Sequence, residues 1–175
     1  MANTNKAVSG LTLSIDRDIF LRNLLRELSG TLEEVVGLDE ASGFVSLVGQ
    51  HIGEWMDGEY RTALGAEQLS LQQVSDVLVD LKRRIEGGFY IVSIEQDKIV
   101  LGNSRCPFGD KVLHRPSLCM MTSNVFGTVS AENLGYAKVC LHNTIANGDK
   151  ECKVTIYINQ NNTAEQDEGR EYFKS

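Results

Sequence analysis

The chain has 175 residues, of which 42% are hydrophobic and 23% charged, a composition typical of one folded domain. Length and composition together exclude a large multidomain machine and a disordered acidic polymer. The formal net charge of −7 opposes the phosphate field of nucleic acid, so we expect no nucleic-acid partner. No apolar run approaches the roughly 18 residues of a membrane-spanning helix. The N-terminus lacks the features of a secretory signal, so we expect a cytoplasmic protein without membrane contact.

Helical periodicity dominates the N-terminal half. Apolar residues three and four positions apart predict one helix over 16–36, with its charged residues mostly on the other side, and a second helix over about 40–63. Four glycines weaken the second helix, which suggests that it depends on close packing. Ser70 and Gln73 form the pattern of a capping box, and it opens a third amphipathic helix that ends before Gly87.

A charged run closes this third helix. It consists of Asp80, Lys82, Arg83 and Arg84. Cations suit the negative end of a helix, so we predict that these side chains are solvated and have no partner.

The pattern changes to short strands in the C-terminal half. Strands are predicted over 89–94 and 98–101, a helix over about 116–132, and two further strands over 136–142 and 152–158. The predicted fold class is α+β, with an N-terminal helical layer packed on a small antiparallel sheet of about four strands. One further helix is inserted between the strand pairs. We expect a flexible N-terminus over 1–14, a single domain over 15–159, and a polar, acidic tail over 160–175 that is mobile or serves for docking.

Three of the four cysteines lie at junctions between predicted elements, namely Cys106, Cys119 and Cys152. They are 13 and 33 residues apart and form no compact C-x-x-C pair, so an ordinary zinc finger or ribbon is not indicated. Folding would have to bring them together. In a reducing compartment, thiols are typical of metal ligands or redox groups, although buried thiols also serve simply as small core residues.

Alternation along the last two strands separates Cys140 from this set. Cys152 continues the apolar face that contains Val154 and Ile156, whereas Cys140 points away from the face of Val139. We therefore predict that Cys140 is a poor partner of Cys152, unless the register or a bulge re-aims it.

Three thiolates favour a soft centre, namely zinc, copper(I) or an iron–sulfur cluster. They leave one coordination position, for which His114 is the candidate; the alternative for this histidine is a solvated loop side chain. The dipeptide of Cys106 and Pro107 can present a thiolate to haem, but such pairs are common by chance and we do not expect haem. We therefore predict Cys106, Cys119 and Cys152 as ligands of an iron–sulfur cluster or zinc, with His114 as the fourth metal ligand.

The stretch from Cys106 to Ile158 resembles the C-terminal half of the 4-vinyl-reductase-type sensor fold, and most closely the methanogen output domain. The most specific motifs are CPF at Cys106, PSLC ending at Cys119 and GDKEC ending at Cys152. The helical segment IDRDIFLRNLLRELSG is also similar to proteins of this group, so the resemblance covers most of the chain.

The resemblance implies a sensory input module of prokaryotic signalling that dimerises through its helical layer. Phenol-sensing regulators with this fold hold a structural zinc with cysteines, some of which match Cys119 and Cys152. Leu141 and Thr144 stand where those regulators have a glutamate and a further cysteine, so this chain departs from that site. The triple with Cys106 is instead similar to that of iron–sulfur-sensing regulators.

We therefore predict a cytoplasmic sensory or adaptor module that holds a metal or iron–sulfur centre through three cysteines. It is expected to form a homodimer and to signal by contact with a protein such as a kinase or regulator. No catalytic motif stands out, so we do not expect an enzyme. One alternative is a metal-free module that binds an organic molecule against the sheet near Phe126 and Tyr136. A second is a reductase-type enzyme, which only the name-giving members of the fold suggest.

Overall fold

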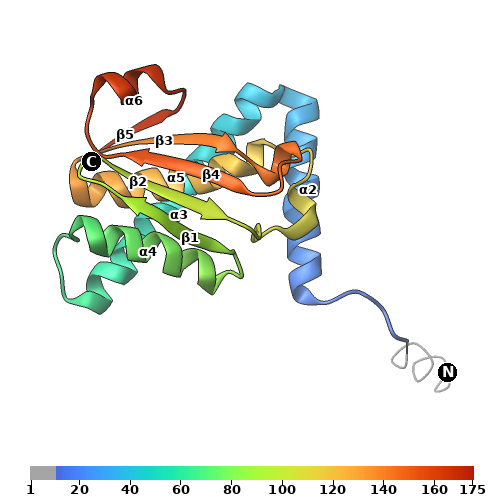
Figure 1. Ribbon diagram of the computed structural model, residues 1–175. Coiled ribbons are helices and arrows are strands. Elements are labelled where there is room, and N and C mark those ends of the chain that lie inside the picture. The colour runs from blue at the N-terminus through green and yellow to red at the C-terminus, as the bar shows by residue number, and fades with distance from the viewer. Residues whose placement is uncertain (1–10) are drawn as a thin grey trace.

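Three helices form the N-terminal half of the computed structural model, which describes residues 11–175 (Figure 1). They are α2 (Arg17–Val36), α3 (Leu38–Leu64) and α4 (Leu71–Arg84). Asp16 caps α2 by accepting a hydrogen bond from the Ile19 N–H. At α4 the predicted capping box is confirmed, because the Gln73 N–H donates to Ser70 Oγ and the Ser70 N–H donates to Gln73 Oε1.

The C-terminal half builds one antiparallel sheet and one long helix. The strands are β1 (Phe89–Ile94), β2 (Lys98–Asn103), β3 (Tyr136–Asn143), β4 (Cys152–Tyr157) and β5 (Arg170–Phe173), in the spatial order β1-β2-β4-β3-β5. The helices are η1 (Gly109–Val112), α5 (Ser117–Leu134), η2 (Ile145–Asn147) and α6 (Asn162–Gln166). The predicted α+β class is confirmed, with α5 between the two strand pairs.

Helix α5 lies between the sheet and α3, and most of its side chains are buried (Figure 1). Two of the α3 glycines explain how closely the two helices pack. A methyl group at Gly49 would collide with Asn124, and one at Gly53 would collide with Thr128. This agrees with the expectation that the glycine-rich helix depends on close packing.

One face of the sheet forms the main core with α4 and α5. Its largest fully buried side chains include Ile99, Leu101, Val139, Val154 and Ile156. At the centre the rings of Phe89 and Phe126 meet edge to face, with centroids 5.2 Å apart.

The segment after Gln160 differs from the predicted tail. It contains α6 and a fifth strand, β5, which pairs with β3, and Tyr172 packs against Gly127 of α5. The Tyr172 hydroxyl lies 2.9 Å from Ser123 Oγ. The polar, acidic composition of this segment gave no indication of the short strand β5, whose inward-facing residue is Tyr172. The predicted flexible N-terminus lies, up to residue 10, outside the described residues.

Helix α2 presents its polar side to the molecule and its apolar side outward. It crosses one end of the domain beside η1 (Figure 1). Arg26 donates to the carbonyl oxygens of Lys111 and Leu113 at 2.7 and 2.8 Å, whereas Phe20 and Leu28 are more than half exposed. The predicted apolar stripe therefore exists but does not enter the core. Within residues 11–175, every helix is too short or too polar to span a membrane.

Candidate thiol site

A cavity of about 30 Å³ lies where the apolar face of the sheet meets the loop after β2 and the first turns of α5. Its lining includes Cys106, Cys119 and Cys152, which we call the thiol site. The structure thus brings together three cysteines that are far apart in sequence. The cavity is otherwise mostly apolar, with Phe89, Pro107, Phe108, Val112, Leu118, Leu141 and Val154 in its wall.

Each cysteine comes from a different type of element. Cys106 lies in the turn after β2, where its carbonyl accepts a hydrogen bond from the Gly109 N–H at 2.9 Å. Cys119 lies in the first turn of α5. Cys152 is the first residue of β4 and pairs with Asn103 of β2, with its side chain on the same face as Val154.

All three sulfurs have hydrogen-bond donors beside them. Cys152 Sγ accepts from the Ile145 N–H at 3.4 Å and from Asn103 Nδ2 at 3.6 Å. The Phe108 backbone and the Thr144 side chain act to lower the pKa values of Cys106 and Cys119, respectively. Donors of this kind favour the thiolate over the thiol, and they tune metal centres held by cysteine.

Burial acts in the opposite direction. It raises the pKa of the Cys106 thiol above its usual value and raises the pKa of Cys119 to about 12. A thiolate at one of these positions would also repel a thiolate at the next. Burial therefore favours the neutral thiol at Cys106 and Cys119, although the charge of Lys82 acts to lower both pKa values.

Lys82 supplies a positive charge at this place, which the sequence reasoning missed. The prediction of a solvated Lys82 is wrong, because its side chain is 3% exposed and its Nζ donates to Thr122 Oγ1 at 2.8 Å. Burial lowers the Lys82 pKa to about 8, while thiolates at the three site cysteines would raise it. The sequence spacing could have predicted this burial, because Lys82 follows Val74 and Leu78 at intervals of four and so lies on the buried stripe of α4.

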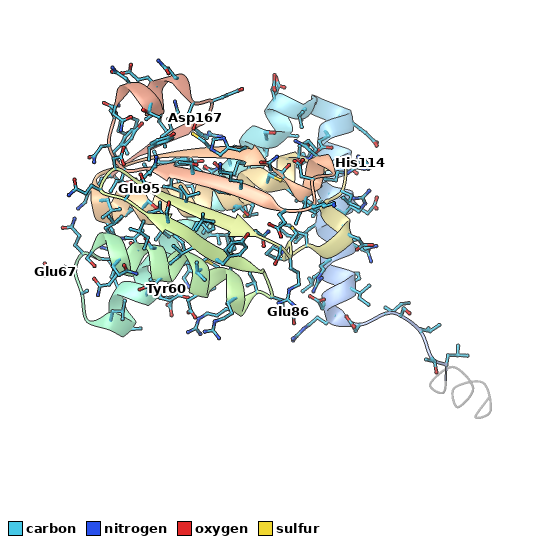
Figure 2. The ribbon with its side chains drawn as sticks, in the orientation of Figure 1. Tyr60, Glu67, Glu86, Glu95, His114 and Asp167 are labelled. Carbon is cyan, nitrogen blue, oxygen red and sulfur yellow. The ribbon has the colours of Figure 1, made fainter. Side chains whose placement is uncertain are left out.

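Two predicted features lie apart from the cavity. His114 is exposed, and Figure 2 shows it at the end of the domain beside α2; it is not among the cavity-lining residues. Cys140 is buried on the opposite face of the sheet, with Tyr157 and Ala164, as the alternation predicts. Within residues 11–175, no three side chains of His, Cys, Asp or Glu lie close enough to hold one metal ion as they stand.

As it stands, the cavity has room for neither an organic ligand of ring size nor an iron–sulfur cluster. A protein cavity that binds benzene has a volume of about 150 Å³, whereas this one has about 30 Å³. The two aromatic residues of the organic-ligand alternative are engaged elsewhere: Phe126 is fully buried in the core, and Tyr136 packs against Phe173.

Comparison with known proteins places this geometry in a family. The family model described as methanogen output domain 1 matches residues 24–157. A search of the curated proteins found no match.

Two solved structures share the fold. The phenol-responsive sensory domain of the transcription activator PoxR, solved with phenol, is 13% identical with a TM-score of 0.66, over 88% of this chain and 80% of that one. A trafficking protein particle complex subunit 3 from Naegleria fowleri, covalently bound to palmitic acid, is also 13% identical. Its TM-score is 0.53, over 89% of this chain and 99% of that one.

Proposed function

The chain belongs to the methanogen output domain 1 family, and from this premise we propose that it is a sensory module with a thiolate-bound metal centre. In this proposal Cys106, Cys119 and Cys152 hold zinc or an iron–sulfur cluster. The state of the centre is passed to a protein partner through the helical layer. The fold shared with the PoxR sensory domain supports a sensory role.

The observation that carries the proposal is the convergence of three soft donors on one cavity. The cysteines come from a loop, a helix start and a strand start. Soft thiolates select zinc, copper(I) and iron–sulfur centres over hard cations. Thiolates in an apolar cavity require hydrogen-bond donors and a nearby positive charge. The donors to Cys152 and the buried Lys82 ammonium provide these.

Binding of a centre would change the shape of this end of the domain. Zinc holds sulfur ligands at about 2.3 Å, which draws them close together. In the described structure the groups are not close enough for this. To bring the three sulfurs together, the loop of Cys106 and the first turn of α5 would have to move, because the pairing of Cys152 with β2 limits its own movement.

Helix α2 contacts both of these segments. Arg26 donates to the carbonyl oxygens of Lys111 in η1 and of Leu113 directly after it, and Glu33 accepts from Ser117 Oγ at the start of α5 at 2.6 Å. A shift of the loop therefore pulls on α2 through fixed hydrogen bonds. This provides a physical connection between the thiol site and the outer surface.

We extend the proposal to the assembly: the exposed apolar face of α2 and α3 contacts a second copy of the chain. This face carries Phe20, Leu28, Phe44, Leu47 and Trp55, all more than half exposed. A two-fold contact covers apolar side chains with the same residues of the partner, and it keeps the acidic surface in solvent. Sedimentation should show a dimer that Leu47→Asp dissociates, whereas Val92→Asp on the exposed side of β1 should leave it intact. A wild-type monomer would contradict this part of the proposal.

Anaerobic purification followed by metal analysis and absorption spectroscopy tests the centre itself. The wild type should carry either zinc, without colour, or iron and sulfide, with visible absorption. A variant with Cys106, Cys119 and Cys152 replaced by serine should carry neither. Cys140→Ser is the matched control, because Cys140 lies on the other face of the sheet, and it should keep the wild-type content. Metal-free wild type after reconstitution with zinc or with iron and sulfide would refute the proposal.

A further inference from the structure

Lys82 is a buried cation without a carboxylate. Its side chain is 3% exposed, and among residues 11–175 no ion pair involves it. Fully buried lysines almost always have an anionic partner, since an isolated ammonium in an apolar interior is costly. The structure therefore indicates that an anion belongs next to this lysine.

The protein groups around Lys82 do not neutralise it. Its Nζ donates to the neutral Thr122 hydroxyl at 2.8 Å and lies 5.6 and 5.1 Å from the ring centroids of Phe89 and Phe126. An ammonium has three N–H donors, so one hydrogen bond and two ring faces leave it only partly satisfied.

The unsatisfied charge lies at the thiol cavity. Thr122 and Phe89, which contact the ammonium, both line that cavity. The ionisable groups that act on Lys82 electrostatically are the thiols of Cys106, Cys119 and Cys152. The lysine thus lies directly behind the cavity wall, within electrostatic reach of the three cysteines, although the four residues come from different segments of the chain.

We propose that Lys82 is the counter-charge of the thiol site, so that the site takes a centre with a net negative charge on its sulfurs. This inference rests on the proposed function and defines its ligand class. Lys82 is a positioning residue in this role, because it acts on the centre through its charge and is not itself a ligand.

Charge balance identifies the matching centres. Three thiolates around a zinc ion leave one negative charge, which one ammonium cancels. An oxidised four-iron cluster core has the same charge as zinc, so three thiolates on it also leave one negative charge, but a cluster additionally requires the cavity of about 30 Å³ to widen. A neutral organic ligand would leave Lys82 unpaired, and so would three neutral thiols.

The first test measures the binding of the metal. Zinc affinity is determined by competition with a chromophoric chelator, and cluster occupancy by iron and sulfide content, in wild type, Lys82→Met, Lys82→Gln and Lys82→Arg. The two neutral variants should bind zinc roughly tenfold more weakly or lose the cluster, and Lys82→Arg should retain most of the binding. The matched control is Lys138→Met, since Lys138 donates to the carbonyl of Ala164 away from the cavity. Wild-type affinity in both neutral variants would overturn the inference.

The second test needs no metal. In chelator-treated protein, the alkylation rate of each site cysteine is measured with iodoacetate, which is anionic, and with iodoacetamide, which is neutral. The ratio of the two rates reports the local positive charge, because changes in thiol reactivity affect both reagents. It should fall roughly tenfold in Lys82→Met and Lys82→Gln but not in Lys82→Arg.

The two tests separate the inference from the proposed function. If the wild type binds no metal, the proposed centre fails, and the alkylation ratio still decides whether Lys82 serves the cysteines. A ratio unchanged by Lys82→Met would show that the lysine has a purely structural role with Thr122 and the aromatic rings.

Discussion

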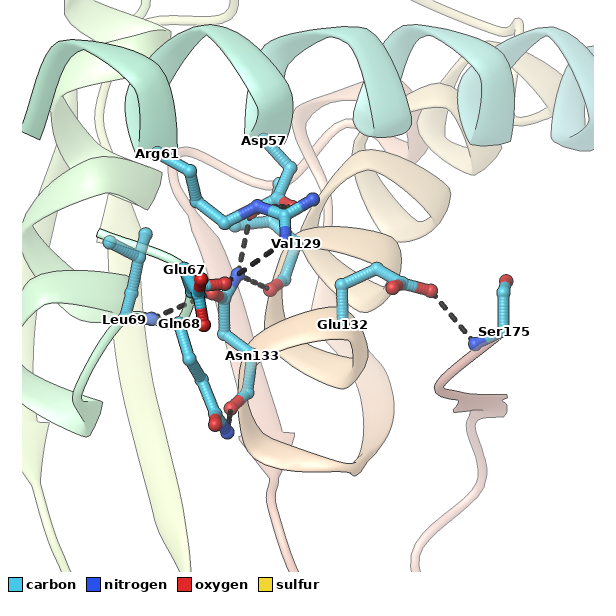
Figure 3. A network of polar contacts seen from close by, with 9 residues as sticks. All are labelled: Asp57, Arg61, Glu67, Gln68, Leu69, Val129, Glu132, Asn133 and Ser175. Atoms are coloured by element: carbon cyan, nitrogen blue, oxygen red, sulfur yellow. Dashed lines mark hydrogen bonds and ion pairs between the residues drawn. The ribbon is translucent and has the colours of Figure 1, made fainter. Parts of the chain in front are cut away.

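Asn133 connects three parts of the helical layer and is the most informative stability target (Figure 3). It is fully buried near the end of α5. Its amide Nδ2 donates to Asp57 Oδ1 of α3 at 2.5 Å and to the Val129 carbonyl at 2.8 Å, while its Oδ1 accepts from the Leu69 N–H at 2.8 Å. Asn133→Ala removes all three hydrogen bonds and leaves the other groups in place.

The cost follows from the groups that lose their partner. A buried N–H without an acceptor, here that of Leu69, costs about 1 to 3 kcal/mol, and a lost hydrogen bond to a charged carboxylate costs about 1.5 to 3 kcal/mol. The carboxylate of Asp57 is 1% exposed and keeps only Arg61, whose Nε lies 2.8 Å away without hydrogen-bond geometry. We expect a loss of about 3 to 5 kcal/mol, which lowers the melting temperature by roughly 6 to 20 °C.

The loss should depend on pH in a defined direction. Burial raises the Asp57 pKa above its ordinary value, although Asn133 and Arg61 act to lower it. A group whose pKa is raised in the folded state penalises folding as the pH rises past its unfolded value of about 3.9, and acid relieves the penalty. Asn133→Ala raises this pKa further. The destabilisation should therefore be larger at pH 7 than near pH 4.5.

Urea unfolding followed by circular dichroism at both pH values measures the difference. Gln72→Ala is the matched control, because Gln72 is an exposed amide that contacts only Asp76 at 3.1 Å, and it should stay within about 0.5 kcal/mol of wild type. A loss for Asn133→Ala equal to that of the control would refute the reasoning. A large loss without pH dependence would refute the part assigned to Asp57.

Four further substitutions concern the start of α4, the β5 segment, α3 and α2. Ser70→Ala removes the capping box and should cost about 1 kcal/mol in thermal or urea unfolding; no loss would contradict the cap assignment. Gly127→Ala places a methyl group against the Tyr172 ring and should cost about 1 to 3 kcal/mol and speed amide exchange over 170–173. Gly43→Ala, whose added methyl group meets no atom of residues 11–175 within 4 Å, should instead stabilise α3 by about 0.5 to 1 kcal/mol. Arg26→Gln removes the two hydrogen bonds to the Lys111 and Leu113 carbonyls, so metal loading should no longer change amide exchange in α2; an unchanged response would exclude this connection.

The regular elements were predictable because their signals are local. A capping box, a period of three to four residues and a period of two residues each depend on neighbours in sequence, and the elements from Ser70 to Ile94 follow them. The orientation of α2 was not predictable in this way. Periodicity shows that a helix has an apolar side, but Arg26 decides which side faces the domain, through carbonyl groups more than 80 residues away.

The same distinction between local signals and contacts distant in sequence applies to the candidate site. Strand alternation correctly separated Cys140 from Cys152, because the side of a strand is a local property. Whether Cys106 lies near Cys119 depends on how the loop folds back over the sheet. The sequence therefore indicated their proximity only through the resemblance to a known family. The charge of Lys82 predicts a solvated side chain, whereas its spacing from Leu78 places it on the buried stripe of α4, and the spacing proved decisive.

The place of the thiol site in the fold limits how it can signal. Cys152 is the first residue of β4, the middle strand of the sheet, and its pairing with Asn103 of β2 limits its movement. Cys106 belongs to a loop, outside the main core, whose Lys111 and Leu113 carbonyl groups accept hydrogen bonds from Arg26 of α2. A centre that joins the two sulfurs would therefore link a rigid strand to a loop that can move. A change in the size or charge of this centre would move the loop rather than the strand. Because α2 exposes its apolar face at the same end, the dimer contact proposed there is the surface that this movement reaches first.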